Sequence, residues 1–265
     1  MSSNAVLATL FALLVSPAAG GPRHQVVYLR GKPQAVRVYD PPADAPRRSM
    51  QILVASGDLG WLGISGDVPE HLQAQGYRVI GLNVQSYLNA FTSRHGSSLS
   101  ARDVPSDFDT IMQATNVNDR YPSAFVSIGV SEGAGLAVIA MGQPGASPSC
   151  RGVIGLGLPE YSEMGWRWTD FPSWITKAEP HEPLAATRDF IAQLQAPLVV
   201  IHSLHDEYDN VDTMRTVVAA APGPKRFIPV DAPNHRFTHH VGEVLSLVDS
   251  SLVWIDSLRP TAIGR

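Results

Sequence analysis

The chain has 265 residues, of which 44% are hydrophobic and 17% are charged, a composition typical of a globular protein and not of a disordered one. Its formal net charge is -4 and no basic stripe runs along it, so the charge pattern excludes an obvious nucleic-acid-binding protein. The single cysteine, Cys150, excludes an intramolecular disulfide and a zinc ribbon.

The first twenty residues have the pattern of an export signal. Residues 5–15 form an apolar run too short to span a bilayer comfortably, and residues 16–21 supply small side chains suited to cleavage near residues 18–20. No Lys or Arg precedes the apolar run, so an uncleaved anchor and an ordinary buried helix remain open as alternatives. We expect residues 1–20 to be a signal peptide and residues 21–265 to form a single domain.

The first part of that domain reads mainly as strands and helices. Residues 25–30 and 35–39 alternate apolar and polar side chains around a Gly-Lys-Pro turn, which predicts an antiparallel pair at a sheet edge. A proline-rich loop follows at 41–48. The elements expected next are a buried strand at 51–55, a helix at 67–75 closed by Gly76, a strand at 77–82, a loop at 83–100 and a helix at 102–116.

The loop Ser56-Gly-Asp-Leu-Gly-Trp61 follows the strand at 51–55, and its glycines permit a tight turn. In serine hydrolases built on such a sheet, this loop supplies one backbone N–H group of the oxyanion hole, and the residue after the nucleophile supplies another. The candidate donors are therefore the backbone N–H groups of Asp58 (or Leu59) and Glu132. An ordinary glycine turn is the alternative.

The stretch 124–136 carries the chain's main chemical motif. Residues 125–130 predict a buried strand and residues 134–141 a buried helix. Between them stands Gly129-Val-Ser-Glu-Gly133, the G-x-S-x-G pentapeptide of a nucleophile elbow, whose glycines allow a strained turn that lifts the serine hydroxyl out of the sheet. We expect Ser131 to be a nucleophile; a serine that only caps the following helix is the alternative.

The second half of the chain alternates strands and helices. We expect strands at 152–156, 197–202 and 226–230, and helices at 185–194, 210–220 and 241–255. From the strand at 51–55 onwards this alternation predicts a mostly parallel sheet with helices on both faces. Pro229 indicates that the last strand lies at a sheet edge.

Residues 158–182 interrupt the alternation and predict a lid-like insertion. The segment is rich in aromatic residues, and its prolines argue against one long helix. Its aromatic side chains could wall an apolar substrate pocket, pin a loop onto the core or contact lipid. The candidate substrate contacts are Trp166 and Trp168 in this segment, Trp61 in the Ser56–Trp61 loop, and Tyr87, which we expect on the active-site rim.

A serine nucleophile needs a base, and the base needs an orienting carboxylate. In open α/β sheets the active residues follow the carboxyl ends of strands. Asp206 follows the strand at 197–202 and His235 follows the strand at 226–230, which gives the chain order Ser, Asp, His. We expect Ser131, His235 and Asp206 to form a catalytic triad.

Other side chains in the same two loops are alternatives. Glu207 or Asp209 could replace the acid, and His239 or His240 could replace the base. A metal site is a further alternative, although a His-x-x-His pair just past a strand lacks the spacing of helical zinc sites. The side chains that would form it are His202, His205, Asp206 and His235.

The elbow, Asp206 and His235 look like those of the α/β-hydrolase superfamily. Ser56-Gly-Asp-Leu-Gly-Trp61, followed by Gly76-Tyr-x-Val-x-Gly-Leu-Asn83 and Tyr87-Leu, is similar to bacterial virulence proteins of the VirJ/AcvB type, and the resemblance covers most of residues 50–255. It implies an α/β-hydrolase fold with a mostly parallel eight-stranded sheet and a periplasmic serine hydrolase, for some members active on aminoacylated phosphatidylglycerol. The chain differs from that family's pattern at Leu59 and at Glu132 in the elbow.

These observations predict an exported serine esterase. Ser131 would attack an ester carbonyl, His235 would move the proton, and water would complete turnover, so no cofactor and no metal are expected. The partner would be a small-molecule or lipid ester, with peripheral membrane contact through the aromatic segment as an option, and no nucleic acid. The alternative from another class is a non-catalytic binding protein of the cell envelope or export machinery on a hydrolase scaffold.

Overall fold

The computed structural model of the protein describes residues 21–93, 98–167 and 182–258. The expected signal peptide and Trp168 lie outside the described residues, as does most of the expected lid, residues 168–181. Within the described part, no helix is long and apolar enough to cross a membrane.

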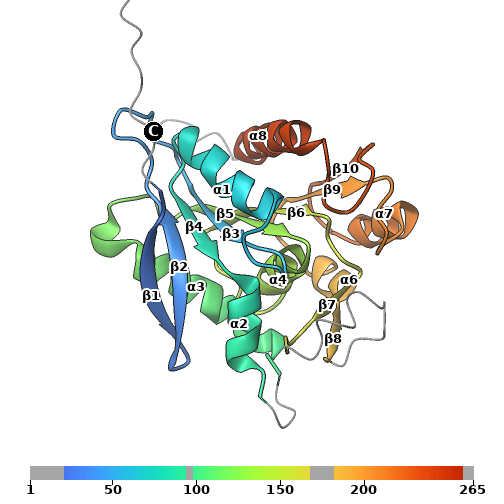
Figure 1. Ribbon diagram of the computed structural model, residues 1–265, viewed down its shortest axis with the longest axis horizontal. Coiled ribbons are helices and arrows are strands. Elements are labelled where there is room, and N and C mark those ends of the chain that lie inside the picture. Colours follow the sequence, from blue (N-terminus) through green and yellow to red (C-terminus); the bar gives the residue numbers. More distant parts are fainter. Residues whose placement is uncertain (1–20, 94–97, 168–181, 259–265) are drawn as a thin grey trace, which may run out of the picture.

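Eight strands form one sheet in the order β1-β2-β4-β3-β5-β6-β9-β10 (Figure 1). Strand β2 runs antiparallel to both of its neighbours, and all other neighbouring pairs in this sheet are parallel. The expected mostly parallel eight-stranded sheet is therefore confirmed. The strands are β1 (Arg23–Leu29), β2 (Lys32–Tyr39), β3 (Gln51–Ala55), β4 (Val79–Leu82), β5 (Phe125–Val130), β6 (Cys150–Leu156), β9 (Leu198–Ser203) and β10 (Lys225–Val230).

Helices cover both faces of this sheet. The described helices are α1 (Ile64–Ala74), α2 (Val84–Phe91), α3 (Val104–Thr115), α4 (Glu132–Met141), α6 (Thr187–Ile191), α7 (Val211–Ala219) and α8 (Val241–Ser257). Helices α1 and α8 pack on one face, while α3, α4, α6 and α7 pack on the other (Figure 1). A separate two-stranded antiparallel sheet, β7 (Tyr161–Glu163) with β8 (Leu184–Ala186), joins the two ends of the aromatic segment.

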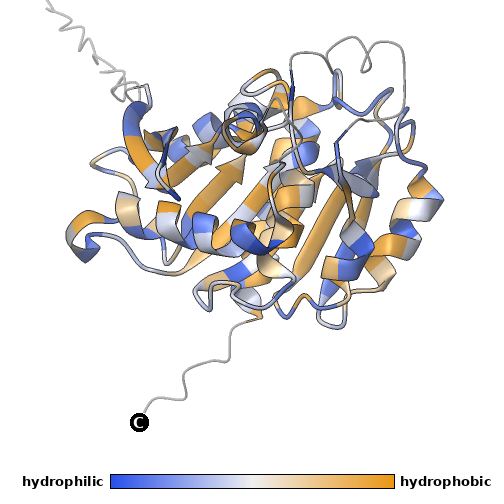
Figure 2. Cartoon of the chain, turned by 90° about the horizontal axis from the view of Figure 1, so that it is seen from below, coloured by the Kyte–Doolittle hydropathy of each residue, from blue (hydrophilic) through white to orange (hydrophobic). Residues whose placement is uncertain are grey.

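The buried strands divide their side chains between two hydrophobic cores. In β3, Ile52 and Val54 belong to the core beneath α1 and α8, whereas Leu53 and Ala55 belong to the core on the opposite face. This alternation follows from the two-residue period of a strand. Figure 2 shows the result, with hydrophobic strands lying between helices that turn polar residues outward.

Two expected elements differ from the structure. The segment expected as a loop at 83–100 begins with helix α2, because Asn83 caps it by accepting a hydrogen bond from the Ser86 N–H, and its apolar residues recur at helical spacing. The helix expected at 185–194 is shorter, because its first residues pair with β7 as strand β8 before α6 begins.

Helix α2 explains why Tyr87 does not serve as the substrate contact expected from the sequence. The Tyr87 side chain is fully buried, and its hydroxyl donates a 2.6 Å hydrogen bond to the Asp107 carboxylate on α3. The same carboxylate receives two hydrogen bonds from Arg30, whose guanidinium lies 3.7 Å from the centre of the Phe91 ring. Tyr87 therefore ties α2 to α3 and to the turn after β1.

We predict that Tyr87→Phe lowers the free energy of unfolding by about 1.5–3 kcal/mol, because a buried carboxylate loses one of its donors. Urea denaturation measures this change. Tyr28→Phe is the matched control, since Tyr28 is 67% exposed and should leave stability unchanged. If Tyr87→Phe changed the KM for an ester and left stability unchanged, Tyr87 would be a substrate contact and not a core residue.

Candidate active site

Ser131 lies on a strained turn between β5 and α4. Its backbone has φ 52° and ψ -122°, a conformation that side chains of L-residues rarely adopt. The turn is possible because a β-carbon at Gly129 would overlap the carbonyl of Gly133, and one at Gly133 would overlap the carbonyl oxygens of Ala55 and Ser56. The Ser131 N–H donates to the Leu156 carbonyl at 2.8 Å, which fixes the turn to β6.

His235 approaches Ser131 from the loop after β10. The distance between His235 Nε2 and Ser131 Oγ is 2.9 Å, and the distance between His235 Nδ1 and Asp206 Oδ2 is 2.7 Å. Since a carboxylate only accepts, His235 Nδ1–H donates to Asp206, and Nε2 is free to accept the Ser131 proton. Gly157, with φ +60°, makes room for the imidazole, because a β-carbon there would lie 2.7 Å from His235 Cε1.

The loop that carries His235 is anchored by its own sequence. Phe237 is buried in the core beneath α8, although its φ is 55°. Asn234 accepts a hydrogen bond from the Thr238 N–H and donates one to the Thr238 hydroxyl. These contacts fix the backbone on both sides of the imidazole.

Asp206 is held in place from several directions. Its side chain is fully buried, and Oδ1 accepts hydrogen bonds from the N–H groups of Tyr208 and Asp209 at 3.0 and 3.2 Å. Burial alone would raise the pKa of Asp206, but the hydrogen bond and charge of His235, together with the Tyr208 N–H, bring the pKa below its ordinary value. Asp206 is therefore an ionised partner for the imidazole.

The other acids and histidines of these loops have different contacts. Glu207 accepts a 2.8 Å hydrogen bond from the His235 N–H, and Asp209 accepts one from the Glu160 N–H. His240 pairs with Glu243 on α8. Among the described residues, no group of three or more His, Cys, Asp or Glu side chains is arranged to hold a metal ion.

The candidate oxyanion donors lie beside Ser131. Gly57, Asp58 and Leu59 line the same cavity as Ser131 and Glu132, and a β-carbon at Gly57 would lie 3.7 Å from Ser131 Cβ. Burial raises the pKa of the Asp58 carboxyl, while hydrogen bonds from the Leu59 N–H and from its own N–H oppose that rise. The Asp58 carboxyl therefore lies close to the loop N–H groups.

The cavity above Ser131 has a volume of about 480 Å³, a size suited to a small-molecule substrate. Three of its lining side chains are large and exposed: Leu62 (69%), Tyr161 (51%) and Tyr208 (48%). The Tyr208 ring meets the His235 ring edge-on, with centroids 5.2 Å apart. The rim is therefore apolar and close to the imidazole.

Three residues with carboxyl groups line this cavity together with Arg236. Asp58, Glu132 and Asp209 line it, and burial raises the pKa of all three carboxyls, that of Glu132 well above its ordinary value. Glu132 accepts a 2.6 Å hydrogen bond from the buried Ser162 hydroxyl. Burial thus favours the neutral form of these carboxyls, and a cation beside them would favour the ionised form.

Two of the tryptophans proposed as substrate contacts, Trp61 and Trp166, do not line this cavity. Trp61 packs against Gly81 and lies beneath the Arg37 guanidinium, and Trp166 packs on the core near α2, with its N–H donating to Thr92. The sequence analysis did not predict that Leu62 and Tyr208 line the cavity. They lie in loops on either side of the elbow, and no sequence pattern shows which loop side chains are exposed.

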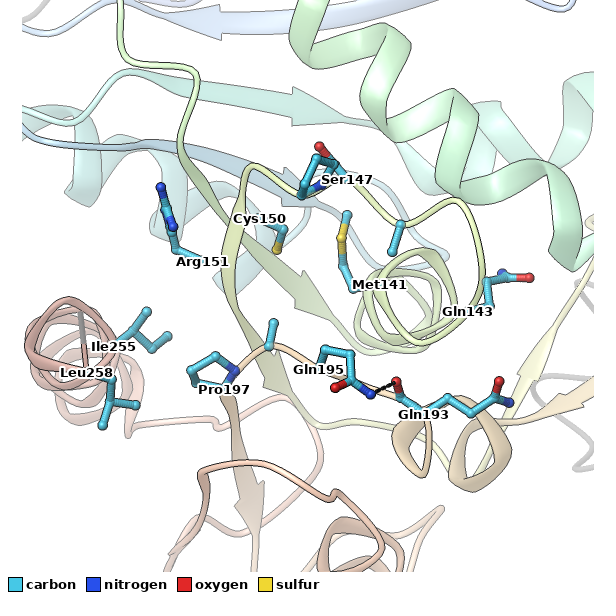
Figure 3. A pocket seen from close by; sticks show the side chains of 13 residues that line it. Met141, Gln143, Ser147, Cys150, Arg151, Gln193, Gln195, Pro197, Ile255 and Leu258 are labelled. Carbon is cyan, nitrogen blue, oxygen red and sulfur yellow. Dashed lines mark hydrogen bonds between the residues drawn. The ribbon is translucent and has the colours of Figure 1, made fainter. Parts of the chain in front are cut away.

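A second cavity has a volume of about 410 Å³ and lies at the amino ends of β6 and β9, away from Ser131 (Figure 3). It is lined by Cys150, Met141, Ile255 and Leu258 among other residues. Burial raises the pKa of the Cys150 thiol to about 11, so this sulfur stays protonated at neutral pH and is a poor nucleophile. Ser131 is the better candidate.

The comparisons with known proteins agree with this fold. Residues 49–215 match the family described as bacterial virulence protein VirJ. No protein with a curated description matches the chain in sequence.

Several solved structures resemble the chain in fold. Est1E from Butyrivibrio proteoclasticus has a TM-score of 0.63 and 13% sequence identity, over 90% of this chain and 100% of that one; another structure of Est1E contains ferulic acid. An alpha-beta serine hydrolase homologue from Coxiella burnetii has a TM-score of 0.60 and 14% identity, and dienelactone hydrolase from Anabaena variabilis 0.60 and 15%. Both matches cover 87% of this chain and 97% of the other. At such identities the likeness shows the α/β-hydrolase fold alone.

The pKa of His235 yields a prediction about pH. Burial lowers it, but the hydrogen bond and charge of Asp206, with the charges of Glu207 and Asp209, raise it above the ordinary value near 6.5. A base must be neutral, so kcat/KM for an ester should rise with pH through a midpoint above 6.5. Glu207→Gln should move that midpoint to lower pH, because one nearby negative charge is removed.

The control is Glu243→Gln, which removes a carboxylate that pairs with His240, not with His235. It should leave the midpoint in place. A midpoint at or below 6.5, or an upward shift in Glu207→Gln, would contradict the assignment of His235 as the base.

Proposed function

The chain belongs to the VirJ family of bacterial virulence proteins, and we propose that it is a serine hydrolase that cleaves a carboxylic ester. The observation that carries this proposal is the hydrogen-bonded chain from Ser131 Oγ through His235 to Asp206, built at the floor of an open cavity. A purely binding protein has no need for a serine on a strained turn with a base at 2.9 Å.

In the proposed reaction, Ser131 Oγ attacks the ester carbonyl while His235 Nε2 takes the hydroxyl proton. The ionised Asp206 keeps Nδ1 protonated and stabilises the imidazolium that forms. The imidazolium then gives its proton to the leaving alcohol, which leaves an acyl group on Ser131. Water, deprotonated by His235, releases the acid and restores the serine.

The negative charge on the carbonyl oxygen would be stabilised by the N–H group of Glu132 at the start of α4 and by that of Asp58 or Leu59. In the structure the Asp58 carboxyl interacts with these loop N–H groups. An ionised Asp58 would also attract a positive charge on the substrate.

The Asp58 and Asp209 carboxyls in the lining support an acyl group that carries an ammonium, as in an aminoacyl ester. The exposed rim of Leu62, Tyr161 and Tyr208 supports an alcohol part with apolar chains. We therefore propose an aminoacyl-lipid ester as the substrate class. The export pattern of residues 1–20 supports a site of action in the periplasm.

The deciding experiment is labelling by a fluorophosphonate probe, which reacts with activated serines. The protein without residues 1–20 should be labelled, and Ser131→Ala and His235→Ala should abolish labelling and lower kcat for a p-nitrophenyl ester by about 10⁴-fold or more. Ser250→Ala, on the exposed side of α8, is the control and should react like the wild type. A folded wild-type protein that resists the probe would support the non-catalytic binding alternative.

Asp58→Asn tests the substrate class. The wild type should prefer an aminoacyl p-nitrophenyl ester over its N-acetylated counterpart, which lacks the positive charge. The substitution should reduce that preference about tenfold, as expected for one lost charge-assisted hydrogen bond of ~1.5 kcal/mol. Asp231→Asn, an exposed carboxylate outside the cavity, should leave the preference unchanged. Equal preferences in the wild type and Asp58→Asn would exclude Asp58 as the cation contact.

A further inference from the structure

A recess lined by arginines lies at the end of the sheet opposite Ser131. It has a volume of about 280 Å³ and is formed by the loop between β2 and β3 together with residues at the starts of β3, β4 and β5. Because β3 has five residues that rise about 3.3 Å each, roughly 17 Å of strand separates this recess from the level of the active site. The two sites are therefore independent.

Arg78 is the buried member of the recess. Its side chain is 2% exposed, and it donates hydrogen bonds to the Asp40 carboxylate, to Gln51 and to the Thr115 carbonyl. Its guanidinium also lies 4.5 Å from the centre of the Tyr121 ring. These contacts hold a positive charge in a fixed orientation at the wall of the recess.

Three more arginines line the recess without a carboxylate partner among the described residues. Arg48 donates twice to the Gln75 carbonyl at the end of α1, and its guanidinium stacks on Tyr77. Arg120 stacks on Tyr121, and Arg47 makes no contact of this kind within the described part of the chain. Positive charge is therefore left uncompensated.

Asp40 cannot neutralise this group. It pairs with Arg78, but it also pairs with Arg23 at 3.0 Å, so one carboxylate serves two guanidinium groups. Burial would raise the pKa of Asp40, yet Arg23 and Arg78 hold it below the ordinary value, so the carboxylate is already ionised. In a chain of net charge -4, the arginines around this recess form a local positive region that favours an anion.

The remaining walls indicate the size of that anion. They are mostly rigid and apolar, and consist of Pro41, Pro42, Pro46, Pro122, Met50 and Tyr121. Guanidinium groups bind phosphate and carboxylate oxygens with paired hydrogen bonds, and several together favour a dianion. We propose that this recess binds a small phosphorylated molecule, with its phosphate on the arginines and a compact apolar part against the prolines.

A phosphate group could also come from a lipid headgroup, but the geometry favours a soluble ligand. The recess lies at the amino ends of the strands, whereas Ser131, Asp206 and His235 follow their carboxyl ends. A membrane bound at the recess would hold the cavity above Ser131 away from the lipid. The choice of a soluble ligand over a lipid rests on the lipid ester proposed for Ser131, whereas the phosphate site itself does not.

The test is calorimetric titration of the protein with inorganic phosphate at low ionic strength, beside a charge-matched pair of double variants. Arg47→Gln with Arg120→Gln removes two recess arginines that hold no ion pair with any residue the structure describes. Arg151→Gln with Arg188→Gln removes two exposed arginines elsewhere. The wild type and the second double variant should bind phosphate saturably, and the first should bind at least about tenfold more weakly.

A second experiment measures binding of the same proteins to phosphatidylglycerol vesicles. The wild type should not bind the vesicles through these arginines. Absence of saturable phosphate binding, or equal weakening in both double variants, would overturn the proposal. The protein could instead bind vesicles but not free phosphate, and lose vesicle binding only in the Arg47→Gln, Arg120→Gln variant. That result would show that the ligand of the recess is a lipid surface and not a soluble molecule. Probe labelling of Ser131 should be the same in all variants, which keeps this test separate from that of the hydrolase.

Discussion

The arrangement of this molecule depends on the absence of two β-carbons. Gly129 and Gly133 let the start of helix α4 lie directly against the backbone of β3 and β5, where any side chain would overlap a carbonyl group. That contact brings the N-terminus of α4 beside the loop after β3. It also forces Ser131 into its left-handed conformation, which points the hydroxyl into the cavity. The cavity, the candidate oxyanion donors and the hydroxyl are thus set by one close approach of backbones.

Much of this arrangement could be predicted from the sequence. The sheet follows from short apolar runs separated by helical periods, and Ser131, Asp206 and His235 could be placed because parallel strands present their carboxyl ends at one edge. The prediction failed where tertiary packing decides. Tyr87 stands among polar residues in the sequence, which predicts a position on the active-site rim. In the structure Asn83 caps the helix that carries Tyr87, and the Tyr87 hydroxyl bonds the buried Asp107, so the side chain lies in the core. The Trp61 ring fills the space that the missing side chain of Gly81 leaves, a contact that no sequence pattern reveals.

The two ends of the sheet differ in charge. The carboxyl ends place Asp58 and Asp209, together with Arg236, around the cavity above Ser131, and the amino ends place arginines around the recess beside Asp40. An overall charge of -4 conceals this separation. The two proposed ligands follow from it, because a cationic acyl group suits one end and a phosphate suits the other. Each charged wall is partly desolvated, and desolvation is what makes a complementary ligand stabilising.

The position of β10 at the sheet edge affects how the protein loses activity on heating. This strand pairs with β9 alone, its Pro229 has no N–H group, and only Val230 at its end is buried. His235 follows this strand, whereas Ser131 follows β5 in the fully buried centre of the sheet. Local opening of the edge would carry the imidazole away from a serine that stays in place. Activity would then be lost on heating once Val230 and Phe237 leave the core beneath α8, while the centre of the sheet stays folded, and it would be recovered on cooling without refolding of the whole chain.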